Sequence, residues 1–186
     1  MFNGKGGILM VEGEAGIGKS RFVREIVMGA RWRGATVFQG QTRETPDASP
    51  FLPLIEAFKP LFNSQSGKEI EGLFVREALA ALAPLNPAWG KELHPEPDGK
   101  RFHNVLRLFG EALAKLTPTM LVVEDLHWAD AVLWESLRSF AAGFIGQGGL
   151  LIISIRHQNK DQIQAWERDG NLKSILLKPF NANEVA

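Results

Sequence analysis

The chain has 186 residues, of which 45% are hydrophobic and 23% are charged, a composition typical of a single folded domain with a buried core. Lys plus Arg and Asp plus Glu each number 21, so no net charge directs the chain to nucleic acid or to an anionic membrane surface. The sequence has no cysteine, no signal-peptide pattern after Met1 and no apolar run of membrane-spanning length, which excludes disulfides and thiolate metal sites and predicts a cytoplasmic domain.

The first motif lies between an apolar segment and a helical pattern. Ile8 to Val11 is a short apolar run typical of a strand, and the apolar residues from Phe22 to Ala30 recur at helical spacing. The residues between them, Gly13-Glu14-Ala15-Gly16-Ile17-Gly18-Lys19-Ser20, have the form G-x-x-x-x-G-K-[ST]. A strand, a glycine-rich loop and a helix in this order predict a phosphate-binding loop. The alternative is a glycine-rich turn that happens to precede a helix.

The residue types in this motif suit a polyphosphate ligand. Glycines let the backbone wrap closely around phosphate groups and point its N–H groups at them, and the following helix adds the positive end of its dipole. We expect Lys19 to contact the β- and γ-phosphates and the Ser20 hydroxyl to hold Mg²⁺. The predicted nucleotide-binding residues are Gly13, Glu14, Ala15, Gly16, Ile17, Gly18, Lys19, Ser20 and Arg21.

Segments of strand type alternate with helical patterns along the chain. The predicted strands are Gly7 to Glu12, Ala35 to Gly40, Met120 to Glu124, Leu150 to Ile155 and Ser174 to Lys178. Helices between successive strands favour parallel pairing, so we predict an α/β domain with a five-stranded parallel sheet.

The segment from 43 to 100 is too long for a simple crossover between strands. It contains two helical patterns, 51–62 and 68–83, and is interpreted as a helical insertion between the second and third strands. His94 is expected in an exposed loop there rather than as a metal ligand. A further helix, up to Leu116, precedes the third strand and ends before Pro118.

The third predicted strand ends in two acids, Glu124 and Asp125. A buried parallel strand would present both at its carboxyl end, where ligands bind in open α/β sheets. Our hypothesis is that Glu124 holds Mg²⁺ through water while Asp125 polarises the attacking water, although the two roles can be exchanged. The alternative is a strand end that simply becomes polar.

Four residues near the ends of the third and fourth strands have two interpretations each. Arg156 follows the fourth strand, where its charge could reach a γ-phosphate or could belong to an ordinary surface arginine. Asp130 precedes a helical pattern and is predicted to cap that helix rather than to act in catalysis. His127 and Trp128 either line the site or pack, and packing is the default expectation.

Three of these segments together resemble a known family. GEAGIGKSR, EDLHWAD after a Val-rich strand, and SIRHQ resemble the signal-transduction ATPases with numerous domains (STAND), in the AAA-like subgroup attached to bacterial transcriptional activators and nucleotide cyclases. The likeness covers about residues 7 to 186. It implies the sheet order 5-1-4-3-2, bound ATP or ADP with Mg²⁺, and assembly in the ATP state.

By position, the resemblance makes Gly13 to Ser20 the phosphate loop, Glu124 and Asp125 the acidic pair, and Arg156 a sensor of the γ-phosphate. The catalytic set is then Asp125, Glu124, Lys19 and Arg156, and the metal set is Ser20 and Glu124. The sequence departs from the family in having Glu124 where aspartate is commoner and Ser154-Ile155 before the arginine. It also lacks the Gly-Arg-Glu segment before the first strand, so the N-terminus is expected to be trimmed.

The last residues suggest a domain boundary. Asn181 and Glu184 have the spacing of a capping box, and LKPFNANEVA resembles the passage into the helical lid of the family. We therefore expect an ATPase domain at 1–180, a truncated lid from 181, and partners in other domains of the same polypeptide.

Several functions stay open at this point. The leading one is a regulatory ATPase with slow turnover, and the second is a scaffold that binds ADP or ATP without hydrolysis. A small-molecule kinase would need an acceptor pocket, for which no distinct motif is present. The segment from Asn159 to Gln162 departs from the N-K-x-D pattern that reads guanine, which favours adenine.

Overall fold

A computed structural model describes residues 6–44, 49–90, 99–116, 118–156, 160–168 and 171–179. The strands are β1 (Gly7–Glu12), β2 (Thr36–Gln41), β3 (Thr119–Glu124), β4 (Leu150–Ile155) and β5 (Leu172–Leu176). The α-helices are α1 (Lys19–Trp32), α2 (Leu52–Phe62), α3 (Gln65–Glu71), α4 (Arg76–Ala81), α5 (Gly99–Leu116), α6 (Ala131–Phe144) and α7 (Lys160–Arg168). Short 3₁₀ turns are η1 (Pro87–Gly90), η2 (Leu126–Trp128) and η3 (Ile145–Gln147).

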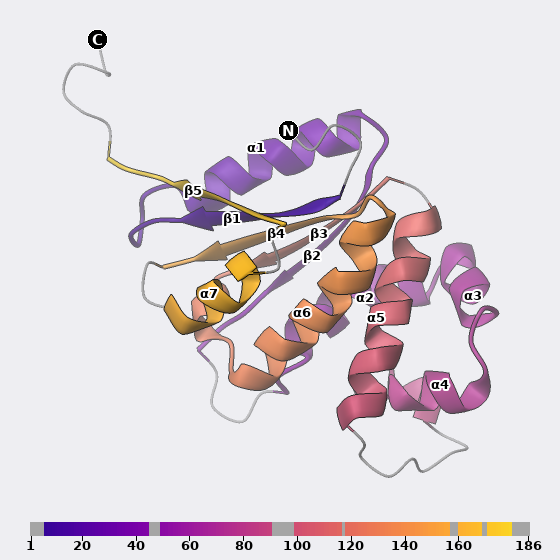
Figure 1. Ribbon diagram of the computed structural model, residues 1–186. Coiled ribbons are helices and arrows are strands. Elements are labelled where there is room, and N and C mark those ends of the chain that lie inside the picture. Colours follow the sequence, from indigo (N-terminus) through magenta and orange to yellow (C-terminus); the bar gives the residue numbers. More distant parts are fainter. Residues whose placement is uncertain are drawn as a thin grey trace.

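The strands form one sheet in the order β2-β3-β4-β1-β5, and all four pairings are parallel (Figure 1). Read from the other edge, this is the predicted order 5-1-4-3-2, so the predicted α/β fold is confirmed. β4 lies between β1 and β3, so only one strand separates the strand before the glycine-rich loop from the strand that ends in the acidic pair.

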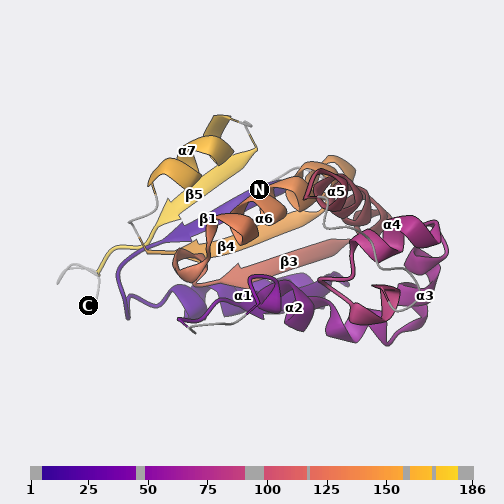
Figure 2. The same cartoon turned by 90° about the horizontal axis from the view of Figure 1, so that it is seen from below.

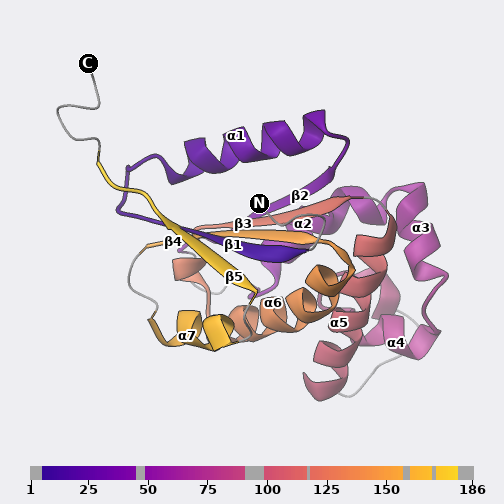
Figure 3. The ribbon, with the colours of Figure 1, turned by 45° about the horizontal axis from the view of Figure 1, so that its top comes forward.

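Alternation along the central strands produces two hydrophobic layers. In β1, Leu9 and Val11 pack against α1, whereas Ile8 and Met10 belong to the larger core on the opposite face. Side chains on a strand point to opposite faces in turn, so an uninterrupted apolar strand is buried on both sides. Figure 3 shows α1 on one face of the sheet and α5, α6 and α7 on the other.

The second predicted helix of the insertion, 68–83, is wrong in one respect, because the segment forms two short helices. α3 ends at Gly72, and the chain restarts α4 from Val75, which has an extended backbone (φ −70°, ψ 154°). Glycine is a poor helix former and a β-branched residue favours the extended conformation. Ile70 and Ala80 are both buried, so each short helix still contributes to the core.

The fifth strand begins two residues earlier than predicted. Its bounds are set by pairing with β1, in which Ile8 is opposite Leu172 and Glu12 is opposite Leu176. This pairing is not visible in the local pattern of the segment, in which Lys173 and Ser174 interrupt the apolar residues.

The helical insertion lies away from the ends of the strands where ligands bind. Figures 1 and 2 show α3 and α4 beside the end of the sheet where the strands begin, opposite the arrowheads. The predicted loop at His94 and the predicted capping box at Asn181 and Glu184 lie outside the described residues. Among the described helices, none has the length and apolarity needed to cross a membrane.

Candidate functional site

The sheet register brings the three motifs of the sequence together at the carboxyl ends of the strands. Glu12, the last residue of β1, is opposite Ile155 of β4, and Gln41 of β2 is opposite Glu124 of β3. The residues that follow these strands therefore emerge together at the carboxyl ends, near the arrowheads in Figure 1. Open α/β sheets bind their ligands at this end of the strands.

The loop after β1 has the backbone that its glycines predict. Gly16 (φ 77°) and Gly18 (φ 101°) have positive φ angles, and Gly18 precedes the first residue of α1. A Cβ atom on Gly13 would lie 2.8 Å from Cγ2 of Ile17 and 3.2 Å from the carbonyl oxygen of Leu177. In the described part of the chain no side chain caps the first turn of α1. Its backbone N–H groups thus suit an anion.

Lys19 is held inside this loop. Its side chain is only 7% exposed, and Nζ donates hydrogen bonds to the carbonyl oxygens of Gly13 (2.9 Å) and Glu14 (2.8 Å). Burial lowers the pKa of Lys19, while the carboxylate of Asp125 acts in the opposite direction. Lys19 and Asp125 are therefore electrostatic neighbours, although their motifs are far apart in the sequence.

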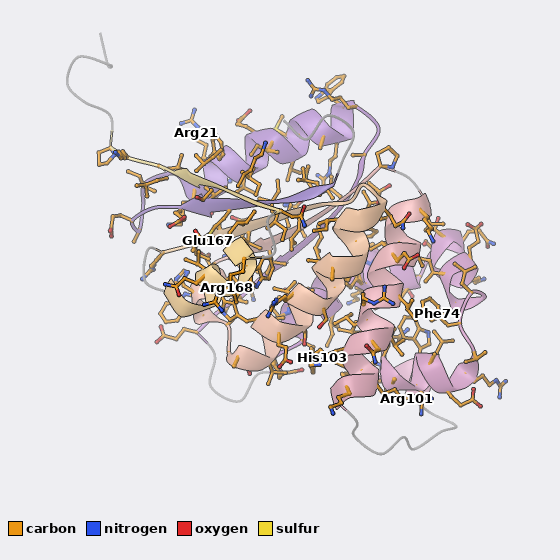
Figure 4. All side chains as sticks on the ribbon, viewed as in Figure 1. Arg21, Phe74, Arg101, His103, Glu167 and Arg168 are labelled. Carbon is orange, nitrogen blue, oxygen red and sulfur yellow. The ribbon has the colours of Figure 1, made fainter. Side chains whose placement is uncertain are left out.

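The two residues after Lys19 are exposed in the first turn of α1. The Ser20 hydroxyl is thus accessible at the mouth of the loop. Arg21 projects from the side of α1 that faces away from the sheet (Figure 4). The backbone N–H of Arg21 is therefore closer to the loop than its guanidinium is.

Asp125 adopts a left-handed conformation (φ 57°, ψ 34°), which costs a non-glycine residue about 1 to 2 kcal/mol. Two buried hydroxyls hold it there. The Asp125 backbone N–H donates to Ser154 Oγ at 2.9 Å, and the hydroxyl of Thr42 is shared between the carbonyl oxygens of Glu124 and Asp125. Gln41 Nε2 donates to the Asp125 side chain at Oδ2 over 2.9 Å. The carboxylate of this strained turn thus lies beside the end of β2, and its backbone is tied to β4.

Glu124 has a carboxylate oxygen that lacks a protein partner. Oε2 is buried and makes no hydrogen bond to any residue that the structure describes. A buried charged oxygen without a partner is costly, and a water bound to Mg²⁺ would satisfy it. The oxygen chemistry of Glu124 and Ser20 fits Mg²⁺, which usually keeps several waters and binds one or two carboxylates together with phosphates.

Arg156 faces the site rather than bulk solvent alone. Its charge lowers the pKa values of both Lys19 and His127, after burial as the larger cause in each case. Its guanidinium carbon lies 5.5 Å from the centre of the Trp128 ring, within the range of a cation–π contact. Arg156 is thus close to the other charged residues at the ends of these strands, and its contact with a γ-phosphate stays a prediction.

Asp130 has the structural role predicted for it. Its Oδ1 accepts a hydrogen bond from the Leu133 backbone N–H at 2.8 Å and so caps α6. This cap sets the start of α6, which two residues separate from the end of η2.

Sequence reasoning missed three residues of the site, Gln41, Thr42 and Ser154, and it left His127 between lining the site and packing. The first three act through hydrogen bonds to the acidic pair across neighbouring strands. Only the strand register reveals such contacts. A signal existed for Ser154, a hydroxyl residue in an otherwise apolar strand.

A wide hollow of the surface lies away from this site. A hollow of about 1040 Å³ lies where the strands begin, lined by Gly6 and Gly148 together with Arg107, Arg138 and Trp166. A smaller one of about 150 Å³ adjoins Thr42 and Trp128. A phosphate loop binds its ligand with backbone N–H groups at the start of a helix and needs no deep cavity.

Comparison with known proteins decides the family. The model of the AAA ATPase domain matches residues 1–153. The chain belongs to this family. This AAA ATPase domain is also 25% identical, over 98% of its length, to the uncharacterized protein R02095 of Rhizobium meliloti (strain 1021). The match spans 19% of that relative, so the chain corresponds to about a fifth of its length.

Solved structures of low identity are also similar to the AAA ATPase domain. One is that of Drosophila ORC bound to GC-rich DNA and Cdc6, with 16% identity, a TM-score of 0.49 and coverage of 100% of this chain and 54% of the other. Another is Drosophila ORC bound to DNA, with 16% identity, a TM-score of 0.43 and coverage of 99% and 88%. The family and the all-parallel sheet establish a nucleotide-binding ATPase module of P-loop type.

Proposed function

We propose that this AAA ATPase domain binds Mg-ATP at the carboxyl ends of β1, β3 and β4, hydrolyses it slowly, and acts as a nucleotide-controlled module of a larger regulatory protein. The observation that carries the proposal is the convergence of the buried Lys19, the strained Asp125 and Arg156 on one edge of the sheet. Two cations beside an acidic pair suit a triphosphate and the water that attacks it.

Each residue has a role in this proposal. The backbone of Gly13 to Ser20 surrounds the phosphates, and Lys19 exchanges its contacts with the loop carbonyls for contacts with the β- and γ-phosphates. Ser20 and Glu124 would hold Mg²⁺, which supplies positive charge to the phosphates. Arg156 neutralises charge on the γ-phosphate and distinguishes ATP from ADP.

The reaction is the transfer of the terminal phosphoryl group to water. Asp125 accepts a proton from the water while the water oxygen bonds to the γ-phosphorus. The bond between the γ-phosphorus and the oxygen that bridges it to the β-phosphate breaks. ADP and inorganic phosphate leave. The hydrogen bond from Gln41 to Asp125 Oδ2 orients this base, and Oδ1 remains to accept the proton.

The regulatory part of the proposal rests on the wider family and on the length of the relative. The Rhizobium relative is about five times as long as the region that matches this chain, which supports a domain built into a larger polypeptide. We infer a STAND-type switch. Contact of the ATP γ-phosphate with Arg156 favours one conformation of the domain, and this conformation self-associates. The lid and output domains would be partners within the same polypeptide, with no direct nucleic-acid contact by this domain.

The experiment that tests the proposal is calorimetric titration of Mg-ATP and Mg-ADP into the domain. We expect micromolar binding, lost in Lys19→Ala and retained in Lys59→Ala, in which an exposed lysine of α2 is removed. Phosphate release is then measured on the same proteins. Binding without hydrolysis would favour the scaffold function, and no binding of either nucleotide would contradict the proposal.

A further inference from the structure

His127 is a polar residue of the site for which the protein supplies no partner. Both ring nitrogens, Nδ1 and Nε2, are buried and make no hydrogen bond to any of the described residues. A buried donor or acceptor without a partner is destabilising, and such groups in native proteins usually mark an ion, a water or a ligand. His127 is one of four histidines in the chain.

The residues around His127 indicate where a hydrogen-bond partner of its ring nitrogens would lie. The charged groups that act on it are Arg156, Asp125 and Lys19. These residues come from the ends of β4 and β3 and from the start of α1, and they are the three that the proposed function places around the terminal phosphate. The printed ring contacts agree with this placement, since the His127 ring lies 5.0 Å from the Trp128 ring and the Arg156 guanidinium carbon lies 5.5 Å from the same Trp128 ring.

The ring is held in this position by the turn that carries it. In η2, the Trp128 backbone N–H donates to the Asp125 carbonyl oxygen at 3.0 Å. The ring centres of His127 and Trp128 lie 5.0 Å apart, and the guanidinium of Arg156 lies over the Trp128 ring. The preceding residue, Leu126, is fully buried in the core and anchors the turn. The orientation of His127 is thus prepared before a ligand binds.

We propose that His127 binds the γ-phosphate of ATP through a ring N–H and so makes the site selective for the triphosphate over the diphosphate. The inference rests on the proposed function and adds a contact to it. Burial lowers the pKa of His127, with Arg156 and Lys19 acting in the same direction and Asp125 against them. The neutral ring keeps one N–H donor for phosphate and adds no further charge beside two cations.

Packing alone does not account for this residue. Leu126 supplies the apolar contact of η2 with the core, and the ring contact of His127 with Trp128 leaves both of its nitrogens without a hydrogen bond to a described residue. An apolar side chain would cover the same surface without the cost of burying two unpaired nitrogens. The geometry favours a histidine only if a polar ligand reaches it.

The test compares affinities for a non-hydrolysable Mg-ATP analogue and for Mg-ADP in three variants. In His127→Phe we expect the affinity for the analogue to fall about ten-fold or more, the loss of one hydrogen bond to a charged group, and the affinity for ADP to stay unchanged. Asn places its amide near the position of Nδ1 and Gln near that of Nε2, so His127→Asn or His127→Gln should restore part of the loss and identify the nitrogen. His103→Gln, which changes a histidine on α5, is the matched control.

A second measurement separates a ligand contact from a structural role. In ¹⁵N-labelled wild-type protein, the imidazole signals of His127 should shift with the ATP analogue and not with ADP. An unchanged ratio of ATP to ADP affinity in a His127→Phe variant that melts as the wild type does would overturn the inference, as would unmoved imidazole signals. Failure of the wild type to bind either nucleotide would instead contradict the proposed function.

Discussion

At Asp125, the carboxylate proposed as the base is carried by a residue with an unfavourable backbone conformation. The buried hydroxyls of Thr42 and Ser154 hold this conformation from the two neighbouring strands. We predict that Asp125→Asn lowers turnover about 10²- to 10⁴-fold, the usual contribution of a positioned base. Nucleotide affinity should be retained, because asparagine keeps the size of the side chain.

Steady-state phosphate release and calorimetry on the same preparations check this prediction. Glu124→Gln is the matched variant of the neighbouring acid, and it should raise the Mg²⁺ concentration needed for half-maximal turnover. Normal turnover in Asp125→Asn would remove this residue from the role of base. The exchanged assignment would then be supported if Glu124→Gln were inactive.

The pH dependence of stability provides a further residue-scale prediction at His127. Burial holds the pKa of His127 below its ordinary value of 6.5 in the folded state, so the unfolded chain takes up a proton first as the pH falls. Stability is therefore complete above pH 6.5 and decreases below it, until the folded state is protonated as well. We expect the fall in stability between pH 7 and pH 5 to be smaller in His127→Gln, which has no ionisable group.

Urea denaturation of the nucleotide-free protein at several pH values measures this difference. His103→Gln is again a suitable control. Parallel pH profiles for the wild type and His127→Gln would show that the imidazole titrates normally and is not desolvated.

Motif residues could be predicted from the sequence because their chemistry is encoded locally. Lys19 and Asp125 were identified from the loop pattern and from two acids after an apolar strand, and Asp130 was identified from its place before a helix. The hydrogen bonds of Gln41 and Ser154 to Asp125 could not be identified in this way. Their roles depend on which strands are neighbours and in what register, and neither is a property of a local segment.

At the scale of elements, α5 and α6 pack closely through two glycines. A Cβ atom on Gly143 of α6 would collide with the carbonyl oxygen of Arg107 on α5, and one on Gly110 of α5 would lie 2.6 Å from the carbonyl oxygen of Phe140. We predict that Gly143→Ala destabilises the protein by about 2 kcal/mol or more, since the helices must separate to accept the methyl group.

Gly146→Ala is the matched control for this helix contact. A Cβ atom there meets no atom within 4 Å, so the variant should be as stable as the wild type. Chemical denaturation of both variants measures the difference. Equal stability of the two would mean that α5 and α6 do not approach each other as closely as described.

The strands were easier to predict than the helices of the insertion. Apolar runs such as Leu150–Ile155 are buried on both faces and have a strong signal that survives in any context. The segment 68–83 carries a weaker pattern, in which Gly72 and Val75 disfavour a continuous helix. The apolar residues on both sides of this break continue the helical spacing, so the pattern alone did not show that two short helices form.

At the scale of the whole molecule, the sheet separates the proposed chemistry from the helical insertion. The loop after β1 and the acidic pair lie at the carboxyl ends of the strands, while α3 and α4 lie where the strands begin (Figure 2). A nucleotide bound at the carboxyl ends would connect β1, β3 and β4 through the residues that follow each of them. Nucleotide binding should therefore stabilise the whole domain against unfolding rather than order the glycine-rich loop alone.

This stabilisation can be measured as a shift in melting temperature. A ligand that binds only the folded state adds about 2.7 kcal/mol when its concentration is 100 times Kd, and for a domain of this size 1 kcal/mol corresponds to about 2 to 4 °C. Saturating Mg-ATP should thus raise Tm by about 5 to 10 °C. Lys19→Ala should show no such rise, because its loop lacks the buried ammonium. A wild-type rise that persists in Lys19→Ala would place the nucleotide elsewhere on the molecule.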